Sequence, residues 1–372
     1  MPATYWTLKR LGLLDEMKSS DFPRKHSVQF FTGRGRSSTP FYFSEVEPGE
    51  SSATWQVDRA KFDEMLLSNA RRCGAEVRLR TNVKDVSFDG ARASGVLVES
   101  DRGQAATIES RVVVDASGQT TLLSRKLGLK EIDPKLRHVS YFTRYRGARR
   151  GCGIDEGGTL ILRTREDHSW FWFIPLPGDL VSVGVVGAID HLLKGRSSEP
   201  QTVYDEELAL CPALRERLES ATQVGEVSVL RDFSYISRRI AGDGWVLAGD
   251  AFGFLDPIYS SGVFLALKSA EFAADAIIDA FREGDFSARR LGRHGQEYVD
   301  GMEAMRKLVY AYYTPEFSVA RFLKAHPRFR DQVVNLLIGN VYRLPTEGLF
   351  EAMQAEIDLP PSRKLIVPEE GS

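Results

Sequence analysis

The segment that most constrains the fold is 244–278, where a short apolar strand leads through a loop into a long apolar helix. The apolar run at 245–248 is typical of a strand buried on both faces, as in a parallel sheet. The strand ends at Gly249-Asp250, and the helix begins near Gly262. This order of elements predicts an α/β domain in which the end of the strand and the start of the helix lie close together.

This strand–loop–helix segment carries groups that suit a bound anion or cofactor. Asp250, at the carboxyl end of the strand, could accept hydrogen bonds from sugar or ribityl hydroxyl groups. The helix start at Ser260-Ser261-Gly262 offers free backbone N–H groups and a positive dipole end, and Gly262 has no Cβ to keep a ligand away. The alternative is an ordinary helix start in which Ser260 or Ser261 caps the first turn.

Several other elements are predicted from local patterns. Residues 111–115 predict a second strand buried on both faces, because strand-forming residues follow one another without a polar interruption. Residues 59–72 predict a helix, and residues 262–283 predict a helix that is buried on most sides, because it has almost no polar face. Residues 27–31 and 40–46 predict strands joined by a turn.

The stretch 136–188 is rich in aromatic and strand-forming residues. It predicts a separate antiparallel sheet with one face over a cavity. Trp170 and Trp172 are two positions apart on a predicted strand, so their indoles lie on the same face and could wall off a volume with rigid apolar surface. The alternative is that both rings belong to an ordinary aromatic core.

Composition excludes several classes of protein. Of the 372 residues, 42% are hydrophobic and 27% are charged, which is typical of a globular chain and not of a disordered or fibrous one. Lys+Arg total 49 and Asp+Glu total 51, and this balance gives no sign of a nucleic-acid partner. The sequence has no apolar run that could span a bilayer and no metal-binding motif, and its three cysteines form no disulfide framework, so we expect a cytoplasmic protein.

Four motifs point to a known family. Segment 244–278 resembles the second FAD-binding signature of flavoprotein monooxygenases, and residues 111–118 resemble that superfamily's strand ending in an acidic residue and a glycine. More narrowly, the chain resembles the flavin-dependent halogenases, a family similar to the tryptophan halogenases. Within that family it resembles the branch that acts on phenols or pyrroles. Their W-x-W-x-I-P motif matches residues 170–175, and their F-x-x-P-x-x-S-x-G motif matches residues 254–262.

The resemblance implies a reaction. Reduced FAD, supplied by a separate flavin reductase, would use O2 to oxidise chloride or bromide. The oxidised halide would then halogenate an electron-rich aromatic substrate, either free or tethered to a carrier protein, as in secondary metabolism. By the same resemblance, the catalytic residues would be Lys25, Trp170 and Trp172, and the halide would bind at Ser261 and Gly262. The cofactor-binding residues would be Arg59, Asp115, Gly118, Gly249, Asp250, Pro257 and Gly262.

Lys25 matches the position of the family's catalytic lysine, ahead of the predicted strand 27–31. A lysine in an apolar tunnel is poorly solvated, so its pKa falls and its amine becomes neutral near physiological pH. In the family, this amine is held to capture or orient hypohalous acid. The alternative is that Arg24-Lys25-His26 is a charged run on the solvated surface.

The chain departs from the family pattern in two ways. No G-x-G-x-x-G fingerprint follows a strand, so the chain is expected to be N-terminally truncated and to lack the first βαβ unit of the FAD-binding domain. In addition, Tyr259 stands where tryptophan halogenases carry a glutamate. This second departure argues against tryptophan and for a phenolic, pyrrolic or carrier-tethered substrate.

The predicted fold class is α/β, with α+β character. It comprises a three-layer FAD/NAD(P)-binding domain without its first βαβ unit, an antiparallel substrate domain and a C-terminal helical region. The predicted boundaries are 1–130 for the first part of the FAD-binding domain, with strands at 27–46 inserted from the substrate side, 131–240 for the substrate domain, 241–290 for the second FAD-binding part, and 291–372 for the helical region and tail.

Two alternatives to a halogenase stay open on sequence alone. One is another FAD-dependent oxidoreductase, such as a hydroxylase or an enzyme like geranylgeranyl reductase. The other is a flavin-free remnant or binding module. Halide dependence would separate the halogenase from the first alternative, and flavin retention would separate both enzymes from the second.

Overall fold

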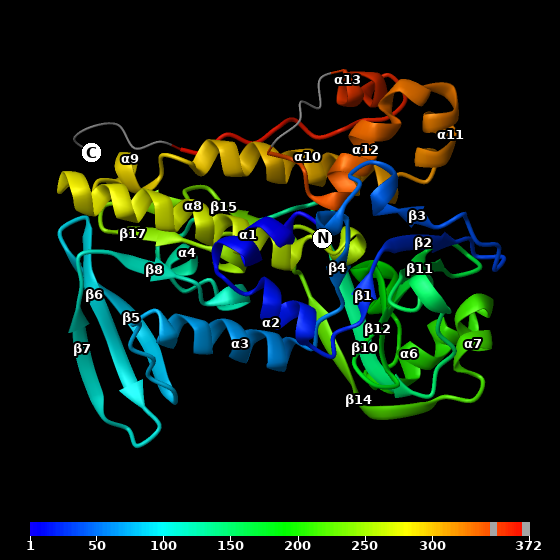
Figure 1. The fold of residues 1–372 in the computed structure, drawn as a ribbon, viewed down its shortest axis with the longest axis horizontal. Helices are drawn as coiled ribbons and strands as arrows, with labels where there is room; N and C mark the ends of the chain where they lie inside the picture. Colours follow the sequence, from blue (N-terminus) through cyan, green and yellow to red (C-terminus); the bar gives the residue numbers. More distant parts are fainter. Residues whose placement is uncertain (343–347, 367–372) are drawn as a thin grey trace. The chain divides into compact units, whose positions relative to one another are not determined.

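The computed structural model describes residues 1–342 and 348–366, and the chain divides into two units (Figure 1). Unit 1 comprises Met1, Gly74–Asp133 and Ser234–Ser372, and unit 2 comprises Pro2–Cys73 and Pro134–Phe233. Each unit is therefore assembled from segments that are far apart in the sequence. The four predicted domains were drawn by function and not by contact, and their boundaries stay a prediction.

Unit 2 is built around a seven-stranded sheet with the order β14-β10-β13-β12-β11-β2-β3 (Figure 1). Neighbouring strands run antiparallel except β2 and β11, which run parallel, so the predicted antiparallel sheet is mixed at one side. The strands are β2 (Ser27–Phe31), β3 (Phe41–Tyr42), β10 (His138–Arg146), β11 (Thr159–Arg163), β12 (Ser169–Pro175), β13 (Leu180–Ala188) and β14 (Thr222–Arg231).

One face of this sheet forms the core of unit 2. Helices α6 (Pro200–Ala209) and α7 (Pro212–Leu218) contribute side chains to this core. Phe171 of β12 lies in it and meets the ring of Tyr204 edge-on, with 5.7 Å between the ring centroids. Because side chains alternate along a strand, Trp170 and Trp172 lie on the opposite face.

The rest of unit 2 contains a two-stranded ribbon of β1 (Arg24–Lys25) and β4 (Thr54–Trp55). It also contains the helices α1 (Thr4–Arg10), α2 (Leu14–Ser19), α3 (Arg59–Arg72) and α5 (Ile189–Leu192). Helix α3 confirms the helix predicted at 59–72. The strand predicted at 40–46 is wrong beyond Tyr42, where a 3-10 turn begins instead. The N–H groups of Val46 and Glu47 donate to the Phe43 carbonyl at 3.3 and 3.2 Å, and this closes the turn.

Unit 1 contains three-stranded sheets with the orders β16-β17-β8, β18-β15-β9 and β5-β6-β7. Their strands are β5 (Thr81–Asp89), β6 (Arg92–Ser100), β7 (Ala105–Glu109), β8 (Val113–Asp115), β9 (Lys130–Ile132), β15 (Tyr235–Ser237), β16 (Ala241–Gly242), β17 (Trp245–Leu247) and β18 (Gly253–Phe254). The described helices of this unit are α4 (Leu122–Lys126), α8 (Gly262–Glu283), α9 (Ala288–Leu291), α10 (Gly295–Tyr313), α11 (Val319–Ala325), α12 (Arg330–Ile338) and α13 (Leu349–Gln354).

Two strands and a helix in unit 1 form the predicted α/β arrangement. β17 and β8 run parallel, and α8 has the predicted bounds and packs beside α10 (Figure 1). The predicted burial was wrong in both elements. Val114 is 46% exposed because the face of the sheet to which it points is not covered there, and Ile278 and Phe281 are 45% and 52% exposed because α8 packs mainly through its small residues.

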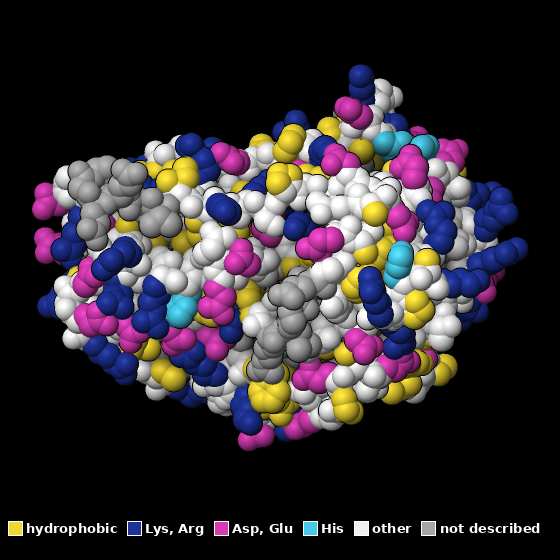
Figure 2. Space-filling model, turned by 90° about the horizontal axis from the view of Figure 1, so that it is seen from above, with side chains coloured by type: hydrophobic (Ala, Val, Ile, Leu, Met, Phe, Trp, Pro, Cys, Tyr) yellow, Lys and Arg dark blue, Asp and Glu magenta, His cyan; other side chains and the backbone are white. Residues whose placement is uncertain are grey.

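The C-terminal part of unit 1 is helical, as predicted, through α13. Of the predicted tail at 359–372, residues 359–366 form neither helix nor strand, and residues 367–372 lie outside the described residues. Among the described helices, none combines the length and the apolar character needed to cross a membrane. On the face of the molecule shown in Figure 2, basic and acidic side chains are interspersed.

Candidate active site

Two strand ends bring predicted cofactor residues together in unit 1. Asp115 of β8 lies opposite Leu247 of β17, and the Ala248 N–H donates to the Asp115 carbonyl at 3.0 Å. The turn that begins at Gly118 contacts the turn that begins at Gly249. Because the two strands are parallel, Asp115, Gly118, Gly249 and Asp250 all lie at one edge of this sheet, where α/β proteins commonly bind ligands.

Gly249 is required by the geometry of its turn. Its φ is +59°, in the left-handed region that disfavours side chains, and a Cβ added there would lie 3.2 Å from the Cβ of Ala266 on α8. Its N–H donates to the hydroxyl of Ser269, also on α8, at 2.7 Å. The end of β17 is thereby held against the helix that follows the loop.

Asp250 is half-buried beside Gly249, and its backbone is fixed. The Tyr235 hydroxyl donates to the Asp250 carbonyl oxygen at 2.8 Å. Burial, with a contribution from the nearby Asp250 charge, raises the pKa of Tyr235 well above its usual value, so the hydroxyl keeps its proton. The carboxylate of Asp250 is thus presented from an anchored backbone.

Asp115 has a local structural role that the sequence did not reveal. Its buried carboxylate accepts hydrogen bonds from the N–H groups of Ser117 at 2.9 Å and Leu123 at 2.8 Å. These bonds shape the turn that carries Gly118, whose φ is +64°. A contribution of Asp115 to cofactor binding stays a prediction and would act through this turn.

The loop that precedes α8 is held by Asp256. This buried carboxylate accepts from the Ile258 N–H at 2.9 Å, which starts the 3-10 turn at Pro257, and from the Tyr313 hydroxyl at 3.1 Å to each oxygen. The ring of Phe254 lies against Gly262, where an added Cβ would come within 2.9 Å of it. Phe254 and Pro257 of the halogenase motif therefore set the start of the helix.

The start of α8 lies at Ser261, which is buried. Ser261 is the N-cap residue, yet its side chain makes no capping hydrogen bond, so the capping role that the alternative gave to Ser261 is wrong. The first N–H groups of a helix have no partner within it, and they lie at the positive end of the helix dipole. An anion, or the electron-rich edge of a flavin, fits this combination of N–H groups, Ser261 and a residue without Cβ at Gly262.

Lys25 lies in unit 2, on the ribbon β1–β4, opposite Thr54. It is only 6% exposed, and its Nζ lies 5.9 Å from the centroid of the Phe43 ring. Burial lowers the pKa of Lys25 to about 8. The lysine is therefore not part of a solvated surface run, and it can carry a neutral amine near physiological pH.

Trp170 and Trp172 lie together on one face of β12, in the same unit. Their ring centroids are 6.3 Å apart, and the rings are inclined at 58°. The indole N–H of Trp172 donates to the Ser182 hydroxyl at 3.1 Å, and an added Cβ on Gly184 would lie 2.3 Å from this indole. Neighbouring strand β13 thus supplies both the hydrogen bond and the space that fix the Trp172 ring.

Arg59 stands apart from these groups. It begins α3, its side chain is 65% exposed, and it binds Asp63 through Nε at 2.9 Å and through a second nitrogen at 3.0 Å. Its predicted role in cofactor binding stays a prediction that no contact in the described residues supports.

Sequence reasoning missed a buried charge network in unit 1. Arg306 binds Glu303 and also Asp133 at 3.3 Å, Tyr310 donates to Asp133 at 2.5 Å, and Arg363 binds Asp133 at 3.1 Å. Only the spacing of Glu303, Arg306 and Tyr310, three and four residues apart on one helix, could have hinted at it. Asp133 and Arg363 are too far from them in the sequence to form a pattern.

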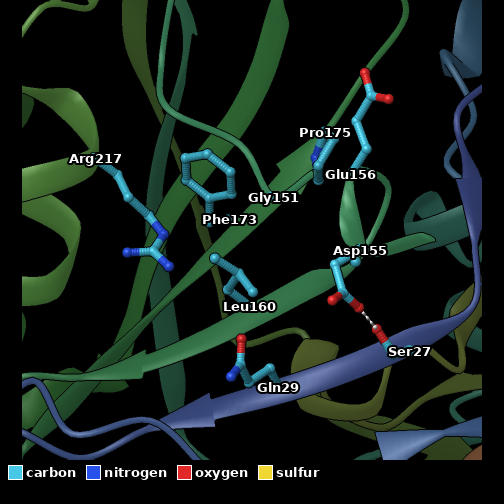
Figure 3. A pocket seen from close by; sticks show the side chains of 10 residues that line it. Ser27, Gln29, Gly151, Asp155, Glu156, Leu160, Phe173, Pro175 and Arg217 are labelled. Atoms are coloured by element: carbon cyan, nitrogen blue, oxygen red, sulfur yellow. Dashed lines mark hydrogen bonds between the residues drawn. The ribbon is translucent and has the colours of Figure 1, made fainter. Parts of the chain in front are cut away.

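A small pocket in unit 2 lies between β2, β11, β12 and the loop 151–158 (Figure 3). Apolar side chains of Leu160 and Phe173 line it, with Arg217 on one side and Asp155 on the other. The Ser27 hydroxyl donates to Asp155 at 3.4 Å across this pocket. The pocket therefore adjoins the segment that follows Lys25.

Comparison with known proteins gives the family. A family model described as tryptophan halogenase matches residues 34–318. The 1H-pyrrole-2-carbonyl-[peptidyl-carrier protein] brominase of Pseudoalteromonas luteoviolacea is 33% identical over 338 residues, which are 89% of this chain and 79% of the brominase. The corresponding chlorinase of Pseudomonas fluorescens is 29% identical over 363 residues, which are 92% of this chain and 80% of the chlorinase.

Solved structures agree with these relatives. A flavin-dependent brominase superposes with a TM-score of 0.82 at 30% identity, covering 94% of this chain and 86% of the brominase. The myxobacterial chondrochloren halogenase superposes with a TM-score of 0.76 at 30% identity, covering 95% of this chain and 82% of that halogenase. The predicted α/β fold and the hypothesis of an FAD-dependent halogenase are confirmed. The chain therefore belongs to the tryptophan-halogenase family and is an FAD-dependent halogenase.

Proposed function

We propose that this halogenase acts on an electron-rich ring of the pyrrole or phenol type that is tethered to a carrier protein. Two relatives carry names that specify a pyrrole-2-carbonyl group on a peptidyl carrier protein. Tyr259 supports the same substrate class, because a neutral side chain stands where tryptophan halogenases have a carboxylate. Its hydroxyl donates to the Leu308 carbonyl at 3.2 Å, so the side chain is held in place.

In unit 1, the proposed roles divide between one side chain and the backbone. Bound reduced FAD would supply two electrons to O2 and the halide would supply two more, so that O2 is reduced to the water level while the halide is oxidised to hypohalous acid. Asp250 accepts hydrogen bonds from the hydroxyl groups of the cofactor, and the turns at Gly118 and Gly249 let the backbone approach it. Ser261, Gly262 and the N–H groups of the first turn of α8 hold the halide.

In unit 2, the proposed roles belong to rigid aromatic rings and a buried amine. Trp170 and Trp172 form an apolar wall that excludes water from the substrate ring. Lys25 holds the oxidised halide beside the ring to be modified, and its pKa of about 8 lets the amine act as a hydrogen-bond partner or nucleophile. The single observation that carries this proposal is the burial of Lys25 in the unit that also carries the two tryptophans.

The test uses the full chain with reduced FAD from a separate flavin reductase, O2, bromide or chloride, and a pyrrole-2-carbonyl carrier protein as substrate. We expect Lys25→Ala to abolish halogenation while O2 consumption continues, because Lys25 handles the oxidised halide and not the flavin. Lys25→Arg should also fail, because a guanidinium stays protonated. Lys84→Ala, which changes a half-exposed lysine on β5, is the matched control and should halogenate like the parent.

Two results would contradict the proposal. Halogenation by Lys25→Ala at the parent rate would remove Lys25 from the chemistry. Halogenation of free pyrrole or phenol at the same rate as the tethered ring would show that the carrier protein is not recognised.

A further inference from the structure

The ribbon that carries Lys25 is too small to hold the lysine in place by itself. β1 and β4 have two residues each, and they pair only with each other, outside the seven-stranded sheet of unit 2. A two-stranded ribbon of ordinary length is already marginal in water. The position of Lys25 must therefore be set by contacts between the ribbon and the rest of unit 2.

Gln56 makes such a contact. It is the buried residue after β4, and its N–H donates to the Pro23 carbonyl at 2.9 Å, which adds one more bond to the ribbon. Its side-chain amide donates to the Gly157 carbonyl at 3.0 Å and to the Thr159 hydroxyl at 2.7 Å. Because Thr159 is the first residue of β11, one amide joins the ribbon to the main sheet.

Gly157 completes the junction by close approach. A Cβ added to Gly157 would lie 2.0 Å from the Arg24 carbonyl oxygen, so the peptide between Arg24 and Lys25 lies directly against this glycine. On the other side of Lys25, the Ser27 hydroxyl donates to Asp155 at 3.4 Å, as Figure 3 shows. The loop 151–158 therefore contacts the chain both before and after the lysine.

We propose that Gln56, together with Gly157, is a positioning residue that sets Lys25 for the halogenation step. The inference rests on the proposed function of Lys25. In this role Gln56 acts through the lysine: it fixes the ribbon and keeps the lysine out of water. This assigns a purpose to the acidic, glycine-rich stretch 151–158, which the cofactor site does not use.

The decisive variant is Gln56→Met, which keeps the length of the side chain and removes both amide donations. Misplacing a reacting group by about 1 Å can cost roughly a hundredfold in rate, so we expect substrate halogenation to fall roughly ten- to a hundredfold. O2 consumption should persist. Oxidised halide should then escape, and a small β-diketone that reacts with free hypohalous acid should capture more of it than with the parent.

A titration of Lys25 supplies a readout that loss of activity alone cannot imitate. Reductive methylation of Lys25, followed by mass spectrometry over a range of pH, reports the pKa of its amine. In the parent this value should be about 8. In Gln56→Met it should move towards the ordinary lysine value of about 10.4, because a loosened ribbon lets water reach the amine.

Gln223→Met is the matched control. Gln223 lies on the edge strand β14, and its amide also makes two donations, to Gln201 at 2.9 Å and to the Gly225 carbonyl at 3.0 Å. This variant should halogenate like the parent. If Gln56→Met does not fold, Thr159→Val, which removes only the hydroxyl acceptor, should show smaller changes in the same direction.

The outcomes separate the two proposals. If Lys25→Ala is inactive but Gln56→Met, or Thr159→Val in its place, matches the parent in both halogenation and Lys25 titration, the positioning role is overturned. If Lys25→Ala halogenates normally, the proposed function fails, whereas a Lys25 titration that shifts in Gln56→Met would still support the positioning of the ribbon.

Discussion

The charge network around Arg306 in unit 1 and the buried Lys25 of unit 2 differ in whether their charges have partners. In unit 1, Asp133 and Glu303 bind Arg306, and Asp256 accepts from a backbone N–H and from Tyr313. In unit 2, no carboxylate in the described part of the chain pairs with Lys25, and burial alone lowers its pKa. A paired buried charge is a means of holding a structure, whereas an unpaired one costs stability and is typical of a reactive group.

The largest effect should come from breaking a paired charge. Arg306→Met leaves Asp133 and Glu303 buried with too little positive charge, and removing one partner of a buried pair costs about 3–5 kcal/mol. We expect the free energy of unfolding, measured in urea, to fall by that amount. Arg282→Met, at an exposed ion pair on α8, should change the free energy of unfolding little. Equal losses in the two variants would mean that the buried network stabilises the fold no more than an exposed ion pair does.

Removing the unpaired charge of Lys25 should raise the free energy of unfolding instead of lowering it. The folded pKa of Lys25 is about 8, below its usual value of 10.5, so the unfolded chain holds a proton that the folded chain has released between these pH values. The parent should therefore gain stability as pH rises from about 8 to about 10.5. Lys25→Met removes the cost of burying the lysine and should stabilise the protein by up to about 3 kcal/mol at pH 7.

Urea unfolding at several pH values checks this second prediction. The advantage of Lys25→Met should be complete at pH 7 and should shrink as the pH rises above 8. If Lys25→Met and the parent are equally stable at pH 7, Lys25 is solvated and the comparison between the two units does not hold.

The third expected effect concerns a charge that is only half-buried. Asp250→Ala should weaken FAD binding by about 1.5–3 kcal/mol, because a hydrogen bond to a charged group is worth that much. The unfolding free energy should stay close to that of the parent, since the fold uses the carbonyl of Asp250. Titration with FAD checks the affinity, Asp250→Asn should lose less, and unchanged affinity in Asp250→Ala would make Asp250 a structural residue.

Local patterns predicted the parts of the site that are continuous in sequence. The bounds of α3 and α8 and the presence of strands at β8 and β17 follow from runs of neighbouring residues, whereas the pairing of these two strands was not predicted. The fixation of Lys25 does not, because Gln56 and Gly157 are about a hundred positions apart and an isolated glutamine or glycine has many possible roles. The burial of α8 was overestimated because an apolar composition does not say which side of a helix has a neighbour.

The charge network of unit 1 also has a consequence for the order in which the protein is completed during synthesis. Its members include Asp133, Arg306 and Arg363, so the network cannot close until the chain has been made through Arg363. All residues of unit 2 have been made by Phe233. During translation, the part that holds Lys25 can therefore fold first, while the segment Gly74–Asp133 waits for its partners and is the part most exposed to chaperones and proteases.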